Sequence, residues 1–252
     1  MKKILLLAFT ASVMLGACKK DKGGDEPETV PTCAMVKIRE YNNSSTDIIR
    51  FDEQGRVKEE TGNDWGTSYE YYSDKIVVTS GPSSGQNNRT ITYTLGGQGR
   101  IIKSVENNDG ASLGIITEYE YNSDGYLVEA TRTGGGEPYT VTYTWTNGNL
   151  VKIESPWSTT DITYGNDVFK DRLIPGFIYG EIYTEYYIQD YFGKQPKNAP
   201  VIEREKSIQS SWSNNTVYSY TKDSKGQIIS YTETKEEETD PWWEYTVDYN
   251  CN

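Results

Sequence analysis

Residues 139–150, YTVTYTWTNGNL, contain the pattern that decides the fold. Up to Trp145 the residues alternate strictly: tyrosine, valine and tryptophan take one face, and threonine takes every position of the other. This period of two indicates a β-strand with one packed face and one face in water. Asn147-Gly148 then predicts a hairpin turn, because that turn requires a positive φ. The stretch therefore encodes a strand, a tight turn and the start of a return strand.

The same strand–turn–strand unit recurs along the chain. Further alternating runs are TITYTL (90–95), ITEYEY (116–121) and VYSY (217–220). Further turns followed by a short apolar run are FDEQGRV (51–57), YNSDGYL (121–127) and YTKDSKGQI (220–228). Three of the turn glycines, Gly99, Gly125 and Gly148, lie 26 and 23 residues apart. A degenerate repeat of this length is typical of β-arrays and barrels.

We expect the barrel to be soluble. Strands that cross a membrane need about 9–11 residues with a continuous apolar face toward lipid. The strands expected here are shorter, and threonine and charge interrupt their faces, as Glu118 and Glu120 do. The sequence therefore predicts one all-β domain over residues 33–252, an antiparallel meander of repeated hairpins that forms an open or porin-like soluble barrel.

One segment departs from the β pattern. Tyrosines recur four residues apart at positions 179, 183, 187 and 191, which is helical spacing. Gly193 can cap such a helix, and Pro196 prevents much continuation. We expect one short helix near residues 180–192, whose tyrosine stripe packs on the sheet edge or plugs the barrel.

The N-terminus resembles that of a bacterial lipoprotein. Two lysines precede an apolar run of 11 residues, Ile4 to Met14, which is too short to span a bilayer and fits a signal peptide. The run ends in Leu15-Gly16-Ala17-Cys18, which resembles a lipobox. This resemblance implies a lipoprotein signal peptide at 1–17, cleavage before Cys18, and attachment of lipid to its thiol. The alternative is an ordinary cleaved signal that leaves an incidental cysteine.

Residues 18–32 are expected to be the lipidated cysteine and a flexible tether, because they combine glycine, proline and charge without apolar periodicity. Lys19-Lys20-Asp21 is similar to the lysine-plus-acid signals that send Bacteroidetes lipoproteins to the cell surface. We therefore expect an outer-membrane protein at the cell surface, with the periplasmic face of the outer membrane as the alternative.

Composition excludes several classes of function. The formal net charge of −12 argues against nucleic acid as a partner. The absence of histidine removes Ser-His-Asp and Cys-His catalysis and every His-ligated metal site. No spacing among the 37 acidic residues singles out a catalytic pair or a calcium loop. We expect a protein without enzymatic activity, cofactor or metal.

After Cys18 only Cys33 and Cys251 remain, one at each end of the expected domain. Because an exported protein folds in an oxidising compartment, these two predict one disulfide. Such a bond would bring the first and last strands side by side. The alternative is two unpaired thiols.

The repeated unit also carries a family resemblance. Residues 51–57 and 121–127 resemble the unit of YD-repeat proteins. Each has an aromatic residue, Asp or Asn, two further residues, glycine, Arg or Tyr, and then Leu or Val. With its lipobox and tether, the chain is similar to a group of Bacteroidetes lipoproteins of unknown function with a porin-like β fold. The resemblance covers roughly residues 33–252 and implies a fold but no reaction.

Two functions are compatible with these features. The first is a carbohydrate-binding module, because sugar rings stack on exposed aromatic rings and the chain has 21 tyrosines and six tryptophans. The candidate tryptophans lie in turn-rich segments and are Trp65, Trp157, Trp212, Trp242 and Trp243. The alternative for each is a place in the core. The second function is a structural or protein-interaction lipoprotein of the cell envelope, with no small-molecule ligand.

Overall fold

The computed structural model describes residues 33–40, 43–62, 65–82, 88–108, 114–168, 186–224, 228–241 and 243–248. These residues belong to one compact unit, Pro31–Asn252, and they form sixteen β-strands and one short 3₁₀ helix. The first eight strands are β1 Cys33–Glu40, β2 Asn43–Phe51, β3 Val57–Thr61, β4 Trp65–Tyr71, β5 Lys75–Pro82, β6 Arg89–Leu95, β7 Ile101–Asn108 and β8 Ile115–Tyr121. The other elements are β9 Leu127–Thr133, β10 Tyr139–Thr146, β11 Asn149–Glu154, β12 Ser158–Val168, η1 Tyr186–Phe192, β13 Asn198–Ser207, β14 Ser213–Lys222, β15 Ile228–Lys235 and β16 Trp243–Asp248.

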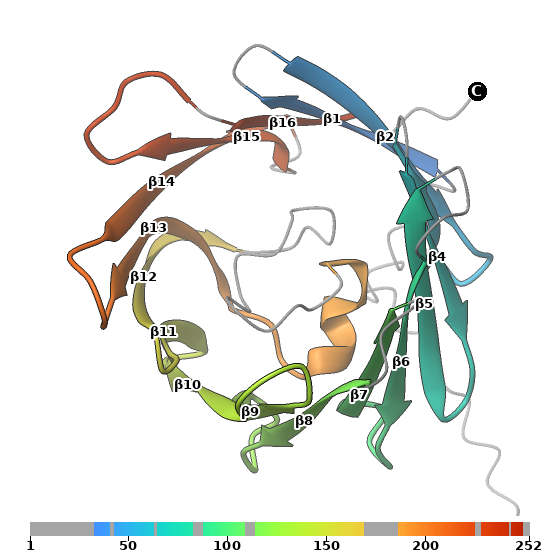
Figure 1. Cartoon of the computed structure of the whole chain (residues 1–252). Coiled ribbons are helices and arrows are strands. Elements are labelled where there is room, and N and C mark those ends of the chain that lie inside the picture. The colour runs from blue at the N-terminus through green and yellow to red at the C-terminus, as the bar shows by residue number, and fades with distance from the viewer. Residues whose placement is uncertain are drawn as a thin grey trace, which may run out of the picture. The chain divides into compact units, whose positions relative to one another are not determined.

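The strands form a closed antiparallel barrel (Figure 1). Each strand pairs with its neighbours in the chain, and β1 closes the ring by pairing with β16, with Val36 opposite Val247. The predicted meander of hairpins is therefore confirmed. Closure leaves none of the described strands at an edge, where unpaired backbone groups would invite another chain to pair.

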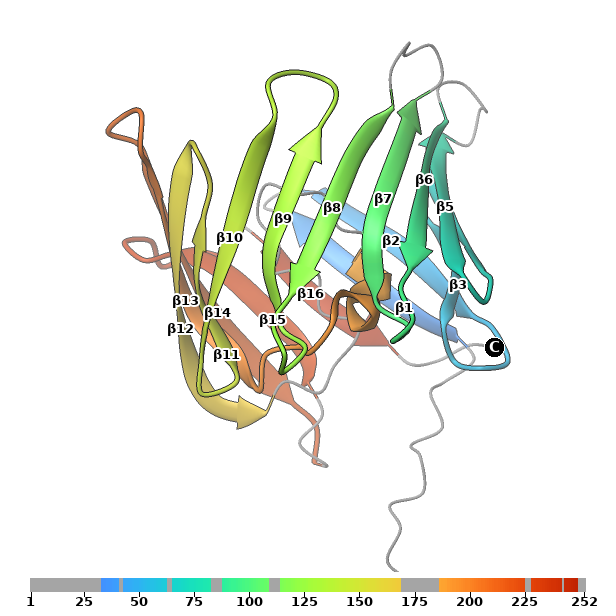
Figure 2. The ribbon, with the colours of Figure 1, turned by 90° about the horizontal axis from the view of Figure 1, so that it is seen from below.

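The barrel has two different ends, because consecutive strands run in opposite directions. The short turns of the repeat, those that follow β2, β4, β6, β8 and β10, all lie at one end, which we call the turn end. The connections that follow the odd-numbered strands lie at the other, which we call the rim end. Figure 2 shows the barrel from the side, with the β8–β9 turn at the bottom and the β9–β10 connection at the top. β1 begins at the turn end.

The repeated turns explain the Asp/Asn-x-x-Gly motif. The Oδ1 of Asp52 accepts hydrogen bonds from the backbone N–H groups of Gln54 and Arg56, both at 2.9 Å. Asn122 Oδ1 accepts the equivalent pair, at 3.1 and 3.0 Å, from the residues two and four positions later. The turn glycines Gly55 and Gly125 have φ of 73° and 91°, which favours glycine. The motif is therefore a turn signal.

A β-bulge follows the turns after β2, β6, β8 and β10, and each of these four bulges is paired with an aromatic clamp. In β9, for example, Leu127 pairs with Tyr121 and Glu129 pairs with Glu120, so one residue of β9 is extra. The carbonyl of Leu127 accepts a 2.6 Å hydrogen bond from the indole N–H of Trp145 on the next strand. Tyrosine hydroxyls form the same clamp by donating to the carbonyl of a residue on the preceding strand. The pairs are Tyr71 with Val57, Tyr121 with Ile101 and Tyr164 with Leu150.

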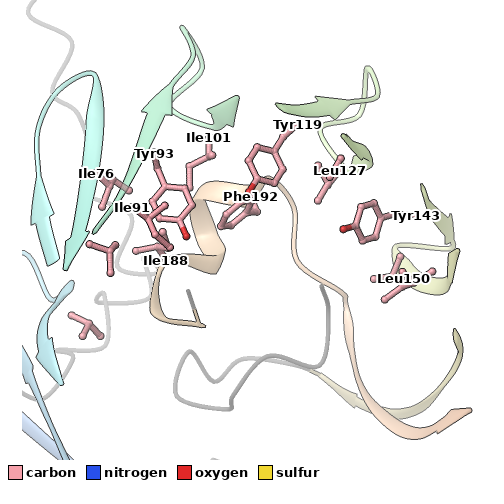
Figure 3. Close-up of a cluster of buried hydrophobic side chains, with 14 of the residues drawn as sticks. Ile76, Ile91, Tyr93, Ile101, Tyr119, Leu127, Tyr143, Leu150, Ile188 and Phe192 are labelled. Atoms are coloured by element: carbon pink, nitrogen blue, oxygen red, sulfur yellow. The ribbon is translucent and has the colours of Figure 1, made fainter. Parts of the chain in front are cut away.

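The inward face of the barrel is apolar near the turn end. Ile91, Tyr93 and Tyr119 point at η1 in Figure 3, and each is at most 5% exposed. The intervening positions of the same strands, such as Glu118 and Glu120, are exposed. The alternation read from the sequence is therefore the alternation between the inside and the outside of the barrel.

The helix expected near residues 180–192 is present over Tyr186–Phe192, as a 3₁₀ helix with a kink at Ile188. It lies inside the barrel rather than on a sheet edge (Figure 1). Of the tyrosine stripe, Tyr187 packs on Tyr69 at 6.1 Å and Tyr191 packs on Tyr71 at 6.0 Å between ring centroids. Positions 179 and 183 lie outside the described residues. None of the described residues forms a helix long and apolar enough to cross a bilayer.

Gly193 ends η1 as expected, with a φ of 89°. A Cβ at this position would lie 2.4 Å from the carbonyl oxygen of Gly125 and 2.9 Å from the ring of Tyr121. That carbonyl also accepts a 3.0 Å hydrogen bond from the backbone N–H of Lys194. The close approach attaches η1 to the β8–β9 turn.

We predict that Phe192→Ala destabilises the barrel by about 3–5 kcal/mol, the usual cost of truncating a fully buried phenylalanine. Phe192 is 0% exposed, and its ring centroid lies 5.1 Å from that of Tyr119 and 5.9 Å from that of Tyr93. Urea unfolding of the chain from Lys19 onward measures the change. Tyr72→Ala is the control, since Tyr72 is 48% exposed. Equal stability of the two variants would contradict the plug role of η1.

Candidate functional site

The candidate tryptophans that the structure describes gather at the rim end. Trp65 is the first residue of β4, Trp157 lies in the β11–β12 turn, and Trp212 directly precedes β14. Their side chains are 41%, 40% and 53% exposed, so none of the three is a core residue. Trp243 begins β16 at the same end, but its side chain and all of Trp242 lie outside the described residues.

The Trp157 and Trp212 turns adjoin and form one surface. The backbone N–H of Ile208 donates to the carbonyl of Trp157 at 2.7 Å, and that of Ser207 donates to the carbonyl of Trp212 at 3.0 Å. Trp157 packs edge-on against Tyr139, with 4.5 Å between ring centroids. Ile208 itself is 61% exposed. We call Tyr139, Trp157, Ile208 and Trp212 the tryptophan patch.

Serine hydroxyls shape the two turns of the tryptophan patch. The Oγ of Ser155 accepts from the N–H groups of Trp157 and Ser158, at 3.1 and 3.0 Å. The Oγ of Ser207 accepts from the backbone N–H groups of Gln209 and Ser210, at 3.2 and 3.1 Å. Side-chain bonds of this kind fix a turn locally. The tryptophans are therefore carried on ordered turns.

These turns are also free of charge. Residues 155–160 read SPWSTT and residues 207–215 read SIQSSWSNN, although a quarter of the chain is charged. The polar groups beside the rings are hydroxyls and amides, which both donate and accept hydrogen bonds. The surface thus combines aromatic faces with neutral hydrogen-bonding groups.

Inside the barrel, the half toward the rim end is polar and charged. Arg89 and Glu106 form a two-point ion pair, with Nε–Oε1 at 2.9 Å and Nη2–Oε2 at 3.2 Å. Glu106 pairs across the ladder with Ile91, which faces inward, so the ion pair is inward too. Glu60, only 8% exposed, accepts a 2.9 Å hydrogen bond from the hydroxyl of Tyr187. The inner face therefore changes from apolar to polar along the barrel.

Glu203 is the most perturbed carboxyl of this inner face. It lies opposite buried Ile162 in the β12–β13 ladder. The pKa of Glu203 is raised to about 7, mainly by burial; a 3.0 Å hydrogen bond from the Tyr218 hydroxyl lowers it and the charge of Glu205 raises it. Glu203 is not among the residues predicted from the sequence, although a polar residue on the inward phase of a strand is a detectable signal.

The cysteine predictions fall largely outside the described residues. Cys18 and Cys251 are not described, and of Cys33 only the backbone is, as the first residue of β1. The last described pair of the β1–β16 ladder is Met35 with Asp248, so the first and last strands lie side by side as expected. The Cys33–Cys251 disulfide stays a prediction. Among the described residues no group of three or more possible ligands could hold a metal ion.

Residues 41–230 match the family described as a domain of unknown function (DUF4595) with porin-like fold. The chain belongs to this family. It is similar to two solved porin-like proteins, one from Bacteroides uniformis ATCC 8492 and one from Bacteroides vulgatus ATCC 8482. The first shares 18% identity at a TM-score of 0.64, over 87% of this chain and 96% of the other. The second shares 12% identity at a TM-score of 0.63, over 86% of this chain and 97% of the other. No curated protein matches the chain.

At these identities the two structures show the porin-like fold alone. The resemblance to a Bacteroidetes family of unknown function with a porin-like fold is confirmed, and so is the porin-like barrel. Neither comparison assigns a ligand, so the DUF4595 domain must be interpreted from its own surface.

We predict that Glu203 makes the stability of the DUF4595 domain fall as pH rises. The folded pKa of about 7 lies above the unfolded value of about 4.3, so the folded state binds this proton more tightly. The free energy of unfolding then decreases between about pH 4.3 and pH 7, by on the order of 1–2 kcal/mol after allowance for solvent screening.

Urea unfolding at a series of pH values measures this contribution as the difference between wild type and Glu203→Gln. In Glu203→Gln the free energy of unfolding should fall less steeply with pH than in wild type. Glu118→Gln, on the exposed outer face, should keep the wild-type pH dependence. Parallel curves for wild type and Glu203→Gln would show that Glu203 does not titrate in this range.

Proposed function

We propose that the chain is an outer-membrane-anchored lipoprotein whose barrel is a non-catalytic carbohydrate-binding module. The observation that carries this proposal is the gathering of exposed tryptophans at the rim end, two of them on adjoining turns without charge. Aromatic residues that are single and scattered would need no explanation, whereas an exposed apolar patch with polar surroundings is typical of a binding surface.

The chemistry of the tryptophan patch favours neutral sugars. The C–H faces of a sugar ring pack on an aromatic ring, and its hydroxyls need partners that donate and accept. Trp157 and Trp212 supply the rings, and the serine, asparagine and glutamine residues of the same turns supply the partners. A charged glycan or nucleic acid would need compensating charge, which residues 155–160 and 207–215 do not contain.

The position of the patch fits an anchored protein. The proposed attachment at Cys18 precedes β1, which begins at the turn end, so the tryptophan patch is at the opposite end of the barrel from the attachment. The tether of residues 19–32 spans up to roughly 40 Å at about 3 Å per residue. The tether then lets the binding surface reach its ligand without contact with the membrane, at the cell surface or, alternatively, in the periplasm.

We predict that Trp157→Ala and Trp212→Ala each weaken glycan binding at least about tenfold, which corresponds to about 1.4 kcal/mol for one stacked ring. The measurement is a titration of the chain from Lys19 with neutral polysaccharides, followed by tryptophan fluorescence and calorimetry. Tyr72→Ala is the matched control, because it removes an exposed aromatic ring at the turn end.

Reducing-sugar release is measured in the same titrations. Saturable binding without release supports a capture module, and release would contradict a non-catalytic one. Binding that the two tryptophan variants leave unchanged would remove the tryptophan patch as its site.

The second candidate is a structural or protein-interaction lipoprotein of the envelope. Ile208 favours it, because an aliphatic side chain that is 61% exposed between two tryptophans also suits a protein partner. A flat response to all neutral glycans, together with an envelope protein that cross-links to wild type but not to Trp212→Ala, would favour this function over sugar binding.

We predict that Cys18→Ala abolishes both fatty-acid labelling and membrane association. Multiple acyl chains hold a protein stably at a membrane, whereas the barrel's outward positions, such as Thr142 and Thr144, are polar and exposed. Metabolic labelling with an alkyne fatty acid and fractionation of cells measure the two effects. Cys33→Ser should keep both, and a membrane-bound Cys18→Ala chain would contradict the anchor.

A further inference from the structure

Two turns of the repeat share one backbone but differ in one carboxylate. Residues 51–57 read FDEQGRV and residues 95–101 read LGGQGRI, so Gly96 takes the place of Asp52. Both turns close with the same pair of backbone hydrogen bonds, between 2.7 and 3.0 Å. The glycine before the arginine has a φ of 73° in the first turn and 72° in the second. The first turn therefore shows which contacts the second turn lacks.

In the first turn the Asp52 carboxylate binds a set of donors from its own loop. Its Oδ1 accepts from the backbone N–H groups of Gln54 and Arg56, both at 2.9 Å, and its Oδ2 accepts from Arg56 Nε at 2.7 Å. The guanidinium also lies over the ring of Tyr71, 4.2 Å from its centroid. Burial raises the pKa of Asp52, but the hydrogen bonds and the charge of Arg56 outweigh burial and lower it. The arrangement therefore favours an ionised carboxylate.

In the second turn the same donors are present without a carboxylate. The guanidinium of Arg100 lies over the ring of Tyr121, 5.1 Å from its centroid. Among the described residues, no carboxylate forms an ion pair with Arg100. Nor does any described group accept from the backbone N–H groups of Gln98 and Arg100. The donors that bind an aspartate in one turn thus lack a protein acceptor in the other.

A pocket with a volume of about 340 Å³ lies beside these donors. It is at the turn end, between the β6–β7 turn and the β8–β9 turn (Figure 2). Gly96, Gly97, Gln98 and Arg100 line it from the β6–β7 turn. A Cβ on Gly97 would meet nothing within 4 Å. Two glycines thus leave open a place where the first turn carries an aspartate and a glutamate.

The rest of the lining suits the hydroxyls and the ring of a sugar. Asn122 and Ser123 line the pocket from the β8–β9 turn. The side-chain amides of Gln98 and Asn122 and the hydroxyl of Ser123 donate to no described residue. Ile102, which is 45% exposed, and the ring of Tyr121 supply apolar surface for C–H groups. Small-molecule pockets span about 300–1,000 Å³, so this one suits a single sugar residue.

We propose that the pocket between the β6–β7 and β8–β9 turns binds a sugar acid, a hexuronate, whose carboxylate takes the place at Arg100 that Asp52 holds at Arg56. The neutral amides and the hydroxyl then bind the sugar hydroxyls. The site goes beyond the proposed function, because the tryptophan patch takes neutral sugars at the rim end and this pocket takes a charged one at the turn end. We call it the Arg100 pocket.

Nuclear magnetic resonance of the chain from Lys19, labelled with ¹⁵N-arginine, tests the site. The Arg100 resonances are assigned by their loss in Arg100→Lys. Methyl β-glucuronide should shift the backbone N–H and the Nε–H of Arg100 saturably downfield. Methyl β-glucopyranoside, which carries a hydroxymethyl group in place of the carboxylate, should not. The Arg56 resonances are an internal control and should stay in place, because Asp52 already binds those groups.

Calorimetry of a matched pair of variants measures the contribution of the charge. Arg100→Gln should weaken binding of methyl β-glucuronide at least about tenfold, because it removes a charge-assisted hydrogen bond. Arg50→Gln removes the same charge from another exposed position and should keep the wild-type affinity. Equal affinities of Arg100→Gln and wild type would overturn the proposal.

Gly96→Asp rebuilds the first turn and tests the site without ligand. Gly96 does not have a positive φ, and a Cβ there would displace only the Cγ2 of exposed Ile102, at 2.8 Å. The Nε–H resonance of Arg100 should move downfield toward that of Arg56, and glucuronide binding should be lost. Gly96→Ala meets the same methyl group without a carboxylate, so it should not cause the downfield shift. A Gly96→Asp chain that still binds the glucuronide would contradict the proposal.

The remaining outcomes concern the ligand and its place. Equal shifts with the two glycosides, or no saturable shift in wild type, would overturn the proposal. Acetate that binds as tightly as the glucuronide, or inorganic phosphate that binds more tightly, would overturn the assignment to a sugar acid. Loss of glucuronide binding in the Trp157→Ala, Trp212→Ala double variant would overturn the Arg100 pocket. Its persistence there, with no binding of neutral polysaccharides by wild type, would overturn the capture function alone.

Discussion

The hydrogen bond from an aromatic side chain to the carbonyl beside a β-bulge is the interaction on which the barrel depends. Four bulges interrupt the ladder next to a tight turn, and in each a carbonyl beside the bulge, as at Leu127, accepts a hydrogen bond from Trp145 or a tyrosine on the next strand. The turn of one hairpin is thereby tied to the following strand. The aromatic–Asp/Asn–x–x–Gly unit thus specifies a turn, a bulge and a clamp together, and its repetition around the ring gives the sheet its regular curvature.

The clamps and the helix together divide the interior into two halves. At the turn end the aromatic rings of the clamps meet η1, and Phe192 fills the space between Tyr93 and Tyr119. Toward the rim end no described helix lies between the walls, and the inward positions carry Arg89, Glu106 and Glu203 instead. The apolar half supplies the hydrophobic stabilisation. The polar half lies toward the same end of the barrel as the exposed tryptophans.

Local patterns predicted the strands well and the site only in part. The period of two in 139–145 correctly identified buried Val141 and Tyr143 and exposed Thr142 and Thr144, because alternation is a property of one strand. Closure by β1 and β16 has no local signature. The four-residue tyrosine spacing predicted a helix, and the described part of that segment is a kinked 3₁₀ helix that packs on Tyr69 and Tyr71. The Arg100 pocket was missed, although residues 95–101 have a glycine where residues 51–57 have Asp52.

The number of strands has a consequence for how this protein can vary. In an antiparallel ring that closes on its first and last strands, an even count returns the chain to the end where it started, and sixteen is even. β1 begins and β16 ends at the turn end, so the rim end consists entirely of connections between strands. Those connections can change in length and sequence without disturbing the closing ladder between β1 and β16. Parity thus separates the end of the barrel that holds the first and last strand termini from an end made of connections that are free to vary.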